Sequence, residues 1–134
     1  MEDGLRFILN QDPKENHLLF LMPSDLPFLN REAIVEALEL KKDHDLIVNG
    51  SRRKDGTSLL VMESSKTIPL HYDDNSFVNH QRESSRLGFD YLASDLEQFS
   101  CDLDDESDIS LVMQRLGARS FQDLLDRLRS MRRD

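Results

Sequence analysis

The fold is decided between residues 17 and 63, in the segments HLLFLM (17–22), REAIVEALELKK (31–42), DLIV (45–48) and SLLVM (58–62). The first segment is a short apolar run closed by Pro23, which is typical of a buried strand. The second repeats its apolar residues at the spacing of a helix. The last two are short apolar runs that a polar turn separates. The predicted order is therefore strand, helix, strand, strand.

The ends of these segments carry capping and turn signals. Asn30 is a suitable N-cap, because its side chain can accept a backbone N–H of the first helical turn. Two turn pairs, Asn49-Gly50 and Asp55-Gly56, follow the second strand. The simplest interpretation is one hairpin with a basic tip, and a tight three-strand meander that uses both turns is the alternative. Residues 67–72 are expected to add an edge strand, where a proline is tolerated.

Beyond residue 75 the apolar spacing becomes helical. Three apolar stripes follow. The first consists of Phe89, Leu92, Leu96 and Phe99, and the second of Ile109, Val112, Met113 and Leu116. The third consists of Phe121, Leu124, Leu125, Leu128 and Met131. The predicted fold class is α+β, with a small mixed or antiparallel sheet from a β-α-β-β unit (residues 17–72) and a helical C-terminal half. One domain is expected over residues 1–134, with an α/β sheet unit at 1–73 and a helical region at 74–134. The expected core residues are Leu19, Leu21, Ile34, Leu38, Ile47, Leu60 and Phe99.

Composition limits the class of protein. The 134 residues carry a formal net charge of −9 and are 38% hydrophobic, which is enough for one modest core. The negative charge disfavours nucleic-acid binding by the molecule as a whole. The longest strongly apolar run, LLFLM, is far below the roughly 20 residues that span a bilayer, and the acidic N-terminus is unlike a signal peptide. The single cysteine excludes an internal disulfide. We therefore expect a soluble cytoplasmic protein.

No catalytic or metal-binding signature stands out. No two histidines have the i, i+4 spacing of a zinc protease helix. Asp43-His44-Asp45 could bind a metal if His71 lay on the neighbouring strand, but a polar turn that enters a strand is the favoured interpretation. Cys101 is interpreted as structural or incidental. The sequence predicts no cofactor and no metal.

Two segments point to nucleic acid. Residues 30–63 resemble the helix-plus-hairpin part of a winged helix, and this resemblance implies phosphate contacts from Lys41, Lys42, Arg52, Arg53 and Lys54. Residues 116–128, LGARSFQDLLDRL, are similar to the turn and second helix of helix-hairpin-helix-like modules, which bind DNA through backbone N–H groups. An alternative without nucleic acid is favoured for both segments. In residues 30–63 the lysines would cap a helix and the arginines would solubilise a turn, and residues 116–128 would form a plain helical hairpin.

The favoured function is a small intracellular protein-interaction domain without catalytic activity, such as an adaptor, an inhibitor or an assembly subunit. It would bind a protein partner or a second copy through the last apolar stripe and its flanking arginines. These residues are Phe121, Leu124, Leu125, Leu128, Met131, Arg127 and Arg132. The acidic run at 102–108 is either a docking surface or a solvated loop. A nucleic-acid module is the second hypothesis, and an enzyme whose site no single sequence reveals is the third.

Overall fold

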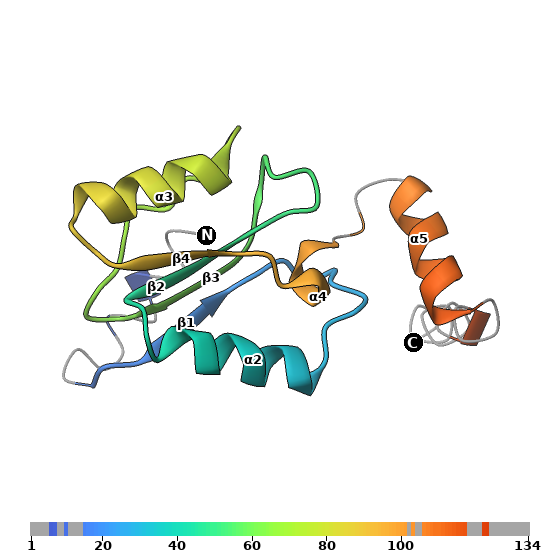
Figure 1. The fold of residues 1–134 in the computed structure, drawn as a ribbon, viewed down its shortest axis with the longest axis horizontal. Coiled ribbons are helices and arrows are strands. Elements are labelled where there is room, and N and C mark those ends of the chain that lie inside the picture. The colour runs from blue at the N-terminus through green and yellow to red at the C-terminus, as the bar shows by residue number, and fades with distance from the viewer. Residues whose placement is uncertain are drawn as a thin grey trace. The chain divides into compact units, whose positions relative to one another are not determined.

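A four-stranded sheet forms the centre of the molecule (Figure 1). The computed structural model describes residues 6, 7, 10, 15–101, 103, 106–117, 122 and 123. The strands are β1 (Leu18–Leu21), β2 (Leu46–Gly50), β3 (Thr57–Glu63) and β4 (Tyr91–Ser94), in the order β1-β3-β2-β4. The chain divides into two compact units, residues 1–102 and 103–134, and the first unit contains the whole sheet.

Three of the four strands run in the same direction. β3 is antiparallel to both β1 and β2, whereas β4 is parallel to β2. The carboxyl ends of β1, β2 and β4 therefore lie at one edge of the sheet, together with the amino end of β3. We call this edge the carboxyl edge and the opposite one the amino edge.

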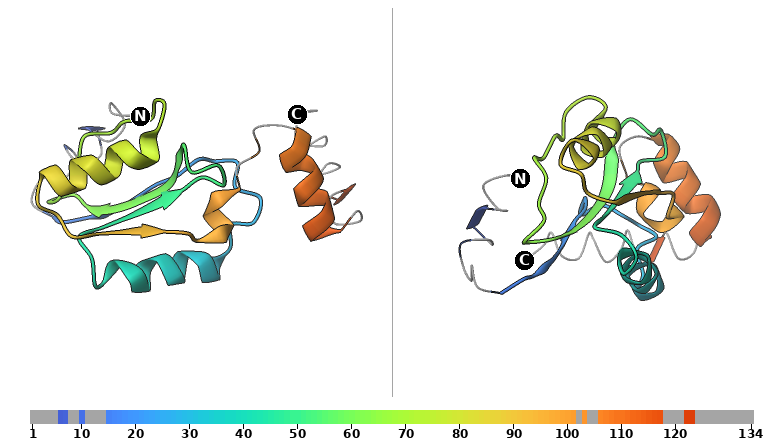
Figure 2. Two further views of the ribbon diagram at one scale, coloured as in Figure 1. Left: turned by 45° about the horizontal axis from the view of Figure 1, so that its top comes forward. Right: turned by 60° about the vertical axis from the view of Figure 1, so that its left-hand side comes forward.

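Helices cover both faces of the sheet. α2 (Arg31–Lys41) lies on one face with the short α4 (Glu97–Ser100), and α3 (Ser76–Arg86) lies on the other (Figure 2). The alternation of side chains along a strand explains this sandwich. Ile47 and Val61 pack with Ala33, Ala37 and other residues on the α2 face. The neighbouring strand residues Leu46, Val48, Leu60 and Met62 pack on the α3 face.

The predicted fold class is confirmed, as are the helix and the single hairpin with a basic tip. The Asn30 side chain accepts a hydrogen bond from the backbone N–H of Ala33 at 2.8 Å, which is the expected N-cap. Of the predicted core residues, Leu19, Ile47, Leu60 and Phe99 are buried, whereas Leu21, Ile34 and Leu38 are half-buried. β1 is an edge strand, which leaves part of its surface uncovered.

Two local predictions were wrong. The apolar stripe that starts at Phe89 does not form one helix, because Gly88, with φ 72°, follows the end of α3 and the chain then returns to the sheet as β4. Only its last residue, Phe99, is helical, in α4. A strand of four residues is too short to show its own period in the sequence. Residues 67–72 form no strand, although Ile68 is buried on the α3 face.

The second unit contains α5 (Glu106–Leu116), which agrees with the predicted second stripe. Gly117 follows it with φ 78°, a conformation that favours glycine at a helix end. All residues of the third stripe, from Phe121 to Met131, lie outside the described residues. Whether residues 1–134 form one domain stays a prediction. None of the helices in the described ranges is long and apolar enough to cross a membrane.

Candidate functional site

Loops from distant parts of the sequence gather at the carboxyl edge. They are the segment after β1, the β2–β3 hairpin tip and the segment from the end of β4 to α4, which lie at the right-hand ends of the strands in Figure 1. In open sheets of α/β proteins, ligands bind outside the carboxyl ends of parallel strands. This edge is therefore the first place to look for a functional site.

The buried side chain of Asn49 connects these segments through hydrogen bonds. Its Oδ1 accepts hydrogen bonds from the backbone N–H of Leu96 at 2.6 Å and from the Ser94 hydroxyl at 2.8 Å. Its Nδ2 donates to the hydroxyls of Ser58 at 3.0 Å and Ser100 at 3.1 Å, and to the carbonyls of Gly50 and Leu96. One amide thus joins β2, β3, β4 and α4 and fixes the positions of the loops that leave them.

The hairpin tip is held by a compact turn. The Ser51 hydroxyl donates to Asp55 Oδ1 at 2.9 Å, and the Gly56 N–H donates to the same carboxylate oxygen at 2.7 Å. The hydrogen bond from Ser51, followed by that from Gly56, holds the pKa of Asp55 below its usual value. The backbone N–H of Arg52 donates to the Ser100 carbonyl at 2.8 Å. The tip is therefore anchored to α4.

The amino end of α3 lies against the same hairpin. The Thr57 N–H donates to the Ser76 hydroxyl at 2.7 Å, and the Phe77 N–H donates to the Asp55 carbonyl at 3.4 Å. Asn75 occupies the N-cap in a left-handed conformation, and its side chain makes no capping hydrogen bond. The amino end of a helix carries partial positive charge and favours anions.

A buried histidine fixes this contact. His80 Nε2 accepts the backbone N–H of His71 at 2.9 Å, so Nδ1 carries the proton and donates to Thr57 Oγ1 at 2.8 Å. Burial, reinforced by the neighbouring His71, lowers the pKa of His80 to about 4. The imidazole is therefore neutral near pH 7 and acts as a structural link between α3, the segment before it and the start of β3.

Charged side chains of both signs are exposed at this edge. The hairpin tip contributes Arg52, Arg53 and Lys54, and Lys54 Nζ lies 2.6 Å from Asp95 Oδ1. Asp25 follows β1, is exposed, and makes no hydrogen bond or ion pair within the described part of the chain. The carboxyl edge thus offers cations, the amino end of a helix and the carboxylate of Asp25.

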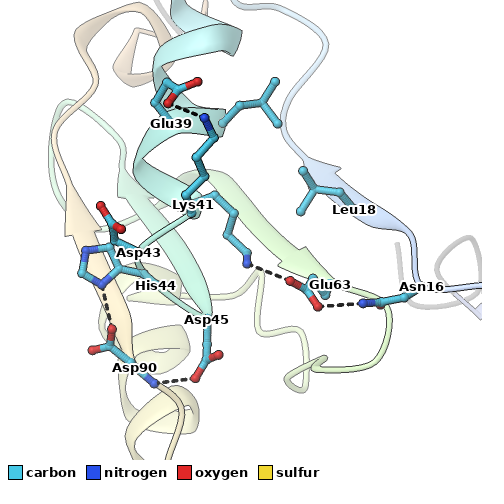
Figure 3. A pocket seen from close by; sticks show the side chains of 11 residues that line it. Asn16, Leu18, Glu39, Lys41, Asp43, His44, Asp45, Glu63 and Asp90 are labelled. Carbon is cyan, nitrogen blue, oxygen red and sulfur yellow. Dashed lines mark hydrogen bonds and ion pairs between the residues drawn. The ribbon is translucent and has the colours of Figure 1, made fainter.

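A groove of about 690 Å³ lies at the opposite, amino edge. It is lined by the end of α2, the turn before β2, and parts of β1, β3 and the segment before β4 (Figure 3). Its charged side chains mostly pair with one another. Lys41 contacts Glu63 at 3.4 Å, Lys42 contacts Glu39 at 2.6 Å and His44 Nδ1 lies 2.8 Å from Asp90.

Most of the remaining polar groups of the groove are also engaged. Asp45 accepts from Lys66 and from the Asp90 N–H, and these bonds, led by the one from Lys66, lower its pKa. The pKa of Glu63 is also lowered, mainly by its hydrogen bond from the Asn16 amide and then by the charge of Lys41. Asp43 has no partner among the described residues, but it is exposed. The groove thus satisfies most of its own charges, and we place the functional site at the carboxyl edge.

The structure separates the basic residues that the sequence grouped as a nucleic-acid contact. Lys41 and Lys42 lie at the amino edge, and Lys41 is buried, whereas Arg52, Arg53 and Lys54 lie at the carboxyl edge. His44 and His71 also have different partners, Asp90 and Glu83. Within the described ranges, no three His, Cys, Asp or Glu side chains are grouped so that they could hold a metal ion. The predicted partner-binding residues Phe121, Leu124, Leu125, Leu128, Met131, Arg127 and Arg132 lie outside the described residues.

Comparison with known proteins identifies the family. The family described as guanylyl transferase CofC like matches residues 2–131, so the chain belongs to it. The 2-phospho-L-lactate guanylyltransferase of Methanocaldococcus fervens is 32% identical over 111 residues, which cover 81% of this chain and 50% of the relative. The enzyme of that name from Archaeoglobus fulgidus is 31% identical over 105 residues, which cover 78% and 49%. The 3-phospho-D-glycerate guanylyltransferase of Phenylobacterium zucineum is 27% identical over 112 residues, which cover 84% and 51%. The chain spans about half the length of the curated relatives it matches.

These matches correct the functional predictions made from the sequence. The favoured hypothesis, a protein-interaction domain without catalytic activity, was wrong, because the family and its relatives are guanylyltransferases. The nucleic-acid module was wrong for the same reason. The ranking of an enzyme as only the third hypothesis is also overturned, because the family consists of guanylyltransferases. The basic hairpin tip was recognised in the sequence, but a site that binds small anionic substrates was not considered for it.

Proposed function

We propose that this chain forms a substrate-binding part of a guanylyltransferase that joins a guanylyl group to the phosphate of a small phosphorylated carboxylic acid. The match to the guanylyl transferase family over residues 2–131 is the observation that carries the proposal. The acids in the relatives' names, 2-phospho-L-lactate and 3-phospho-D-glycerate, share a three-carbon skeleton with one carboxylate and one phosphate ester. We expect the substrate of this chain to have the same two anionic groups.

The reaction class determines what the protein has to supply. A phosphate oxygen of the acid attacks the α-phosphorus of GTP, a new P–O bond forms, and the bond to the β-phosphate breaks to release pyrophosphate. The attacking oxygen is already anionic, so no general base is required. Catalysis then consists of positioning and of charge neutralisation. GTP is available inside cells, and we therefore expect the activity in the cytoplasm.

The carboxyl edge supplies features that this chemistry requires. Arg52, Arg53 and Lys54 provide cationic donors, and guanidinium and ammonium groups form strong charge-assisted hydrogen bonds with phosphate. The amino end of α3, which Ser76 and Phe77 tie to the hairpin, adds backbone partial charge of the same sign. We infer that the phosphates of the reacting pair bind here, on an otherwise acidic molecule.

Mg²⁺ normally accompanies nucleoside triphosphates and is held by one or two carboxylates in addition to the phosphates. Asp25 is one carboxylate that fits this requirement, because it is exposed, follows β1 and has no partner in the described ranges. Two other carboxylates of this edge are engaged: Asp55 in its turn and Asp95 with Lys54. We assign Asp25 as a ligand of the ion, which would neutralise phosphate charge when bound.

The test uses the natural protein that contains this chain. It is incubated with GTP, Mg²⁺ and either 2-phospho-L-lactate or 3-phospho-D-glycerate, and pyrophosphate release and the guanylylated product are measured, the latter by mass spectrometry. We expect product with at least one acid, and much less with ATP in place of GTP. A folded protein that forms no product with either acid would refute the proposal.

A further inference from the structure

Lys54 adopts a backbone conformation that a lysine rarely takes. Its φ is 61°, in the left-handed region that favours glycine, and a side chain there destabilises the backbone locally. The neighbouring Asp55-Gly56 pair already supplies the turn residues. The conformation thus places a long cationic side chain at the hairpin tip, where a glycine would be the easier residue.

The structure guides this side chain along a defined path. A Cβ added to Gly50 would lie 3.0 Å from Lys54 Cδ and 3.3 Å from the Phe77 ring, so the lysine stem packs closely over this glycine and would have to shift by a few tenths of an ångström if Gly50 carried a side chain. The ammonium lies 5.8 Å from the centre of the Phe77 ring, within the range of a cation–π interaction. The charge is therefore held between the hairpin, α3 and the end of β4.

The partner of this ammonium is easily replaced. Lys54 Nζ donates to Asp95 Oδ1 at 2.6 Å, and the two side chains are 46% and 76% exposed. Exposed pairs of this kind are screened by water and salt and contribute little to stability. A phosphate group offers more charge and three acceptor oxygens. Phosphate can therefore displace the single carboxylate.

We propose that Lys54 is a phosphate-binding residue. Its ion pair with Asp95 positions the ammonium at the carboxyl edge, and a substrate phosphate replaces Asp95 there when it binds. The inference rests on the proposed function, which it deepens by naming a residue that determines substrate affinity. The phosphate belongs either to GTP or to the acid, and the kinetics distinguish the two. Lys54 itself moves no proton and forms no covalent bond.

The two partners give opposite predictions, which a merely structural ion pair would not. Lys54→Gly removes the cation and relieves the backbone, so we expect an unchanged or higher melting temperature together with a KM about tenfold higher for one substrate. Asp95→Asn removes the competitor of the phosphate, so the KM for the same substrate should fall or stay equal. A structural pair would weaken the fold and the activity in both variants.

Lys42→Ala is the matched control. Its ammonium makes an equally short, exposed contact of 2.6 Å with Glu39, but at the amino edge. We expect this variant to keep both KM values. If Lys54→Gly changes neither KM while Lys42→Ala behaves the same, the inference is wrong and the proposed function stands.

Direct binding separates the inference from the proposed function. Titration calorimetry of GTP, and separately of 2-phospho-L-lactate, is carried out on the wild-type protein and on Lys54→Gly at low salt. Weaker binding of either ligand to the variant supports the role of Lys54 even if the wild-type protein forms no guanylylated product. Equal binding to both proteins would overturn it.

Discussion

The amide of Asn49 should be the most sensitive polar group in the fold, and Asn49→Asp tests it with almost no change in shape. Asn49 is fully buried. At its Nδ2 position the variant places a carboxylate oxygen that faces the carbonyls of Gly50 and Leu96, which can only accept. The Ser58 and Ser100 hydroxyls can turn to donate, so the conflict is with the carbonyls.

The size of the effect follows from proton linkage. A buried carboxyl without a cationic partner commonly has a pKa about two to three units above its usual value. Each unit corresponds to about 1.4 kcal/mol, so at neutral pH the charge destabilises the fold by about 3–4 kcal/mol. The new carboxyl has a higher pKa in the native state than in the unfolded state. At pH values between these two pKa values, the native state of the variant therefore binds more protons than the unfolded state. Its free energy of unfolding, relative to wild type, therefore falls as the pH rises through that window, and the deficit is small below it.

Urea unfolding followed by circular dichroism, at about pH 5 and about pH 7.5, measures this difference. Asn49→Ala is the control, because it leaves the Leu96 N–H and the Ser94 hydroxyl without their acceptor, at a cost of about 2–5 kcal/mol that does not depend on pH. The reasoning is refuted if the deficit of Asn49→Asp is the same at both pH values, or if it stays below about 1 kcal/mol at neutral pH.

Two further predictions concern the site and the pH response of the fold. Asp25→Asn should lower guanylyl transfer by about a hundredfold or more without changing the melting temperature, since Asp25 is exposed and has no partner in the described ranges; activity close to wild type would remove it from the site. The pKa of His80, lowered to about 4, lies below its unfolded value of about 6.5, so the unfolded chain binds the extra proton and the stability of the fold is lost as the pH falls from about 6.5 to 4. His80→Phe cannot titrate and should show a shallower loss in urea unfolding over this range, whereas an equal loss would assign the effect to other groups.

The sequence predicted those parts of the fold that long patterns or strong local signals specify. The helix from residue 31 has both a stripe and an N-cap, and the hairpin has two turn pairs around a basic tip. β4 was missed because a four-residue strand between Gly88 and α4 matches a helical stripe equally well, and only its pairing with β2 decides the matter. That pairing joins residues about 45 positions apart, such as Leu46 with Tyr91, and no local pattern records it.

The proposed site could not be assembled from the sequence, for a chemical reason as well as a topological one. Guanylyl transfer to an anionic acceptor requires no activated serine or cysteine and no histidine base, so the residue constellations that usually reveal an enzyme are not needed. What it requires is positive charge and backbone N–H groups at a fixed place, and the fold supplies that place by bringing the ends of β1, β2 and β4 to one edge. In the sequence, Asp25 is only a polar residue after an apolar run, and Lys54 is only one of three basic residues in a turn. Strand direction is the information that joins them: β1 and β2 are both antiparallel to β3, which lies between them, so the segments after β1 and β2 meet at one edge.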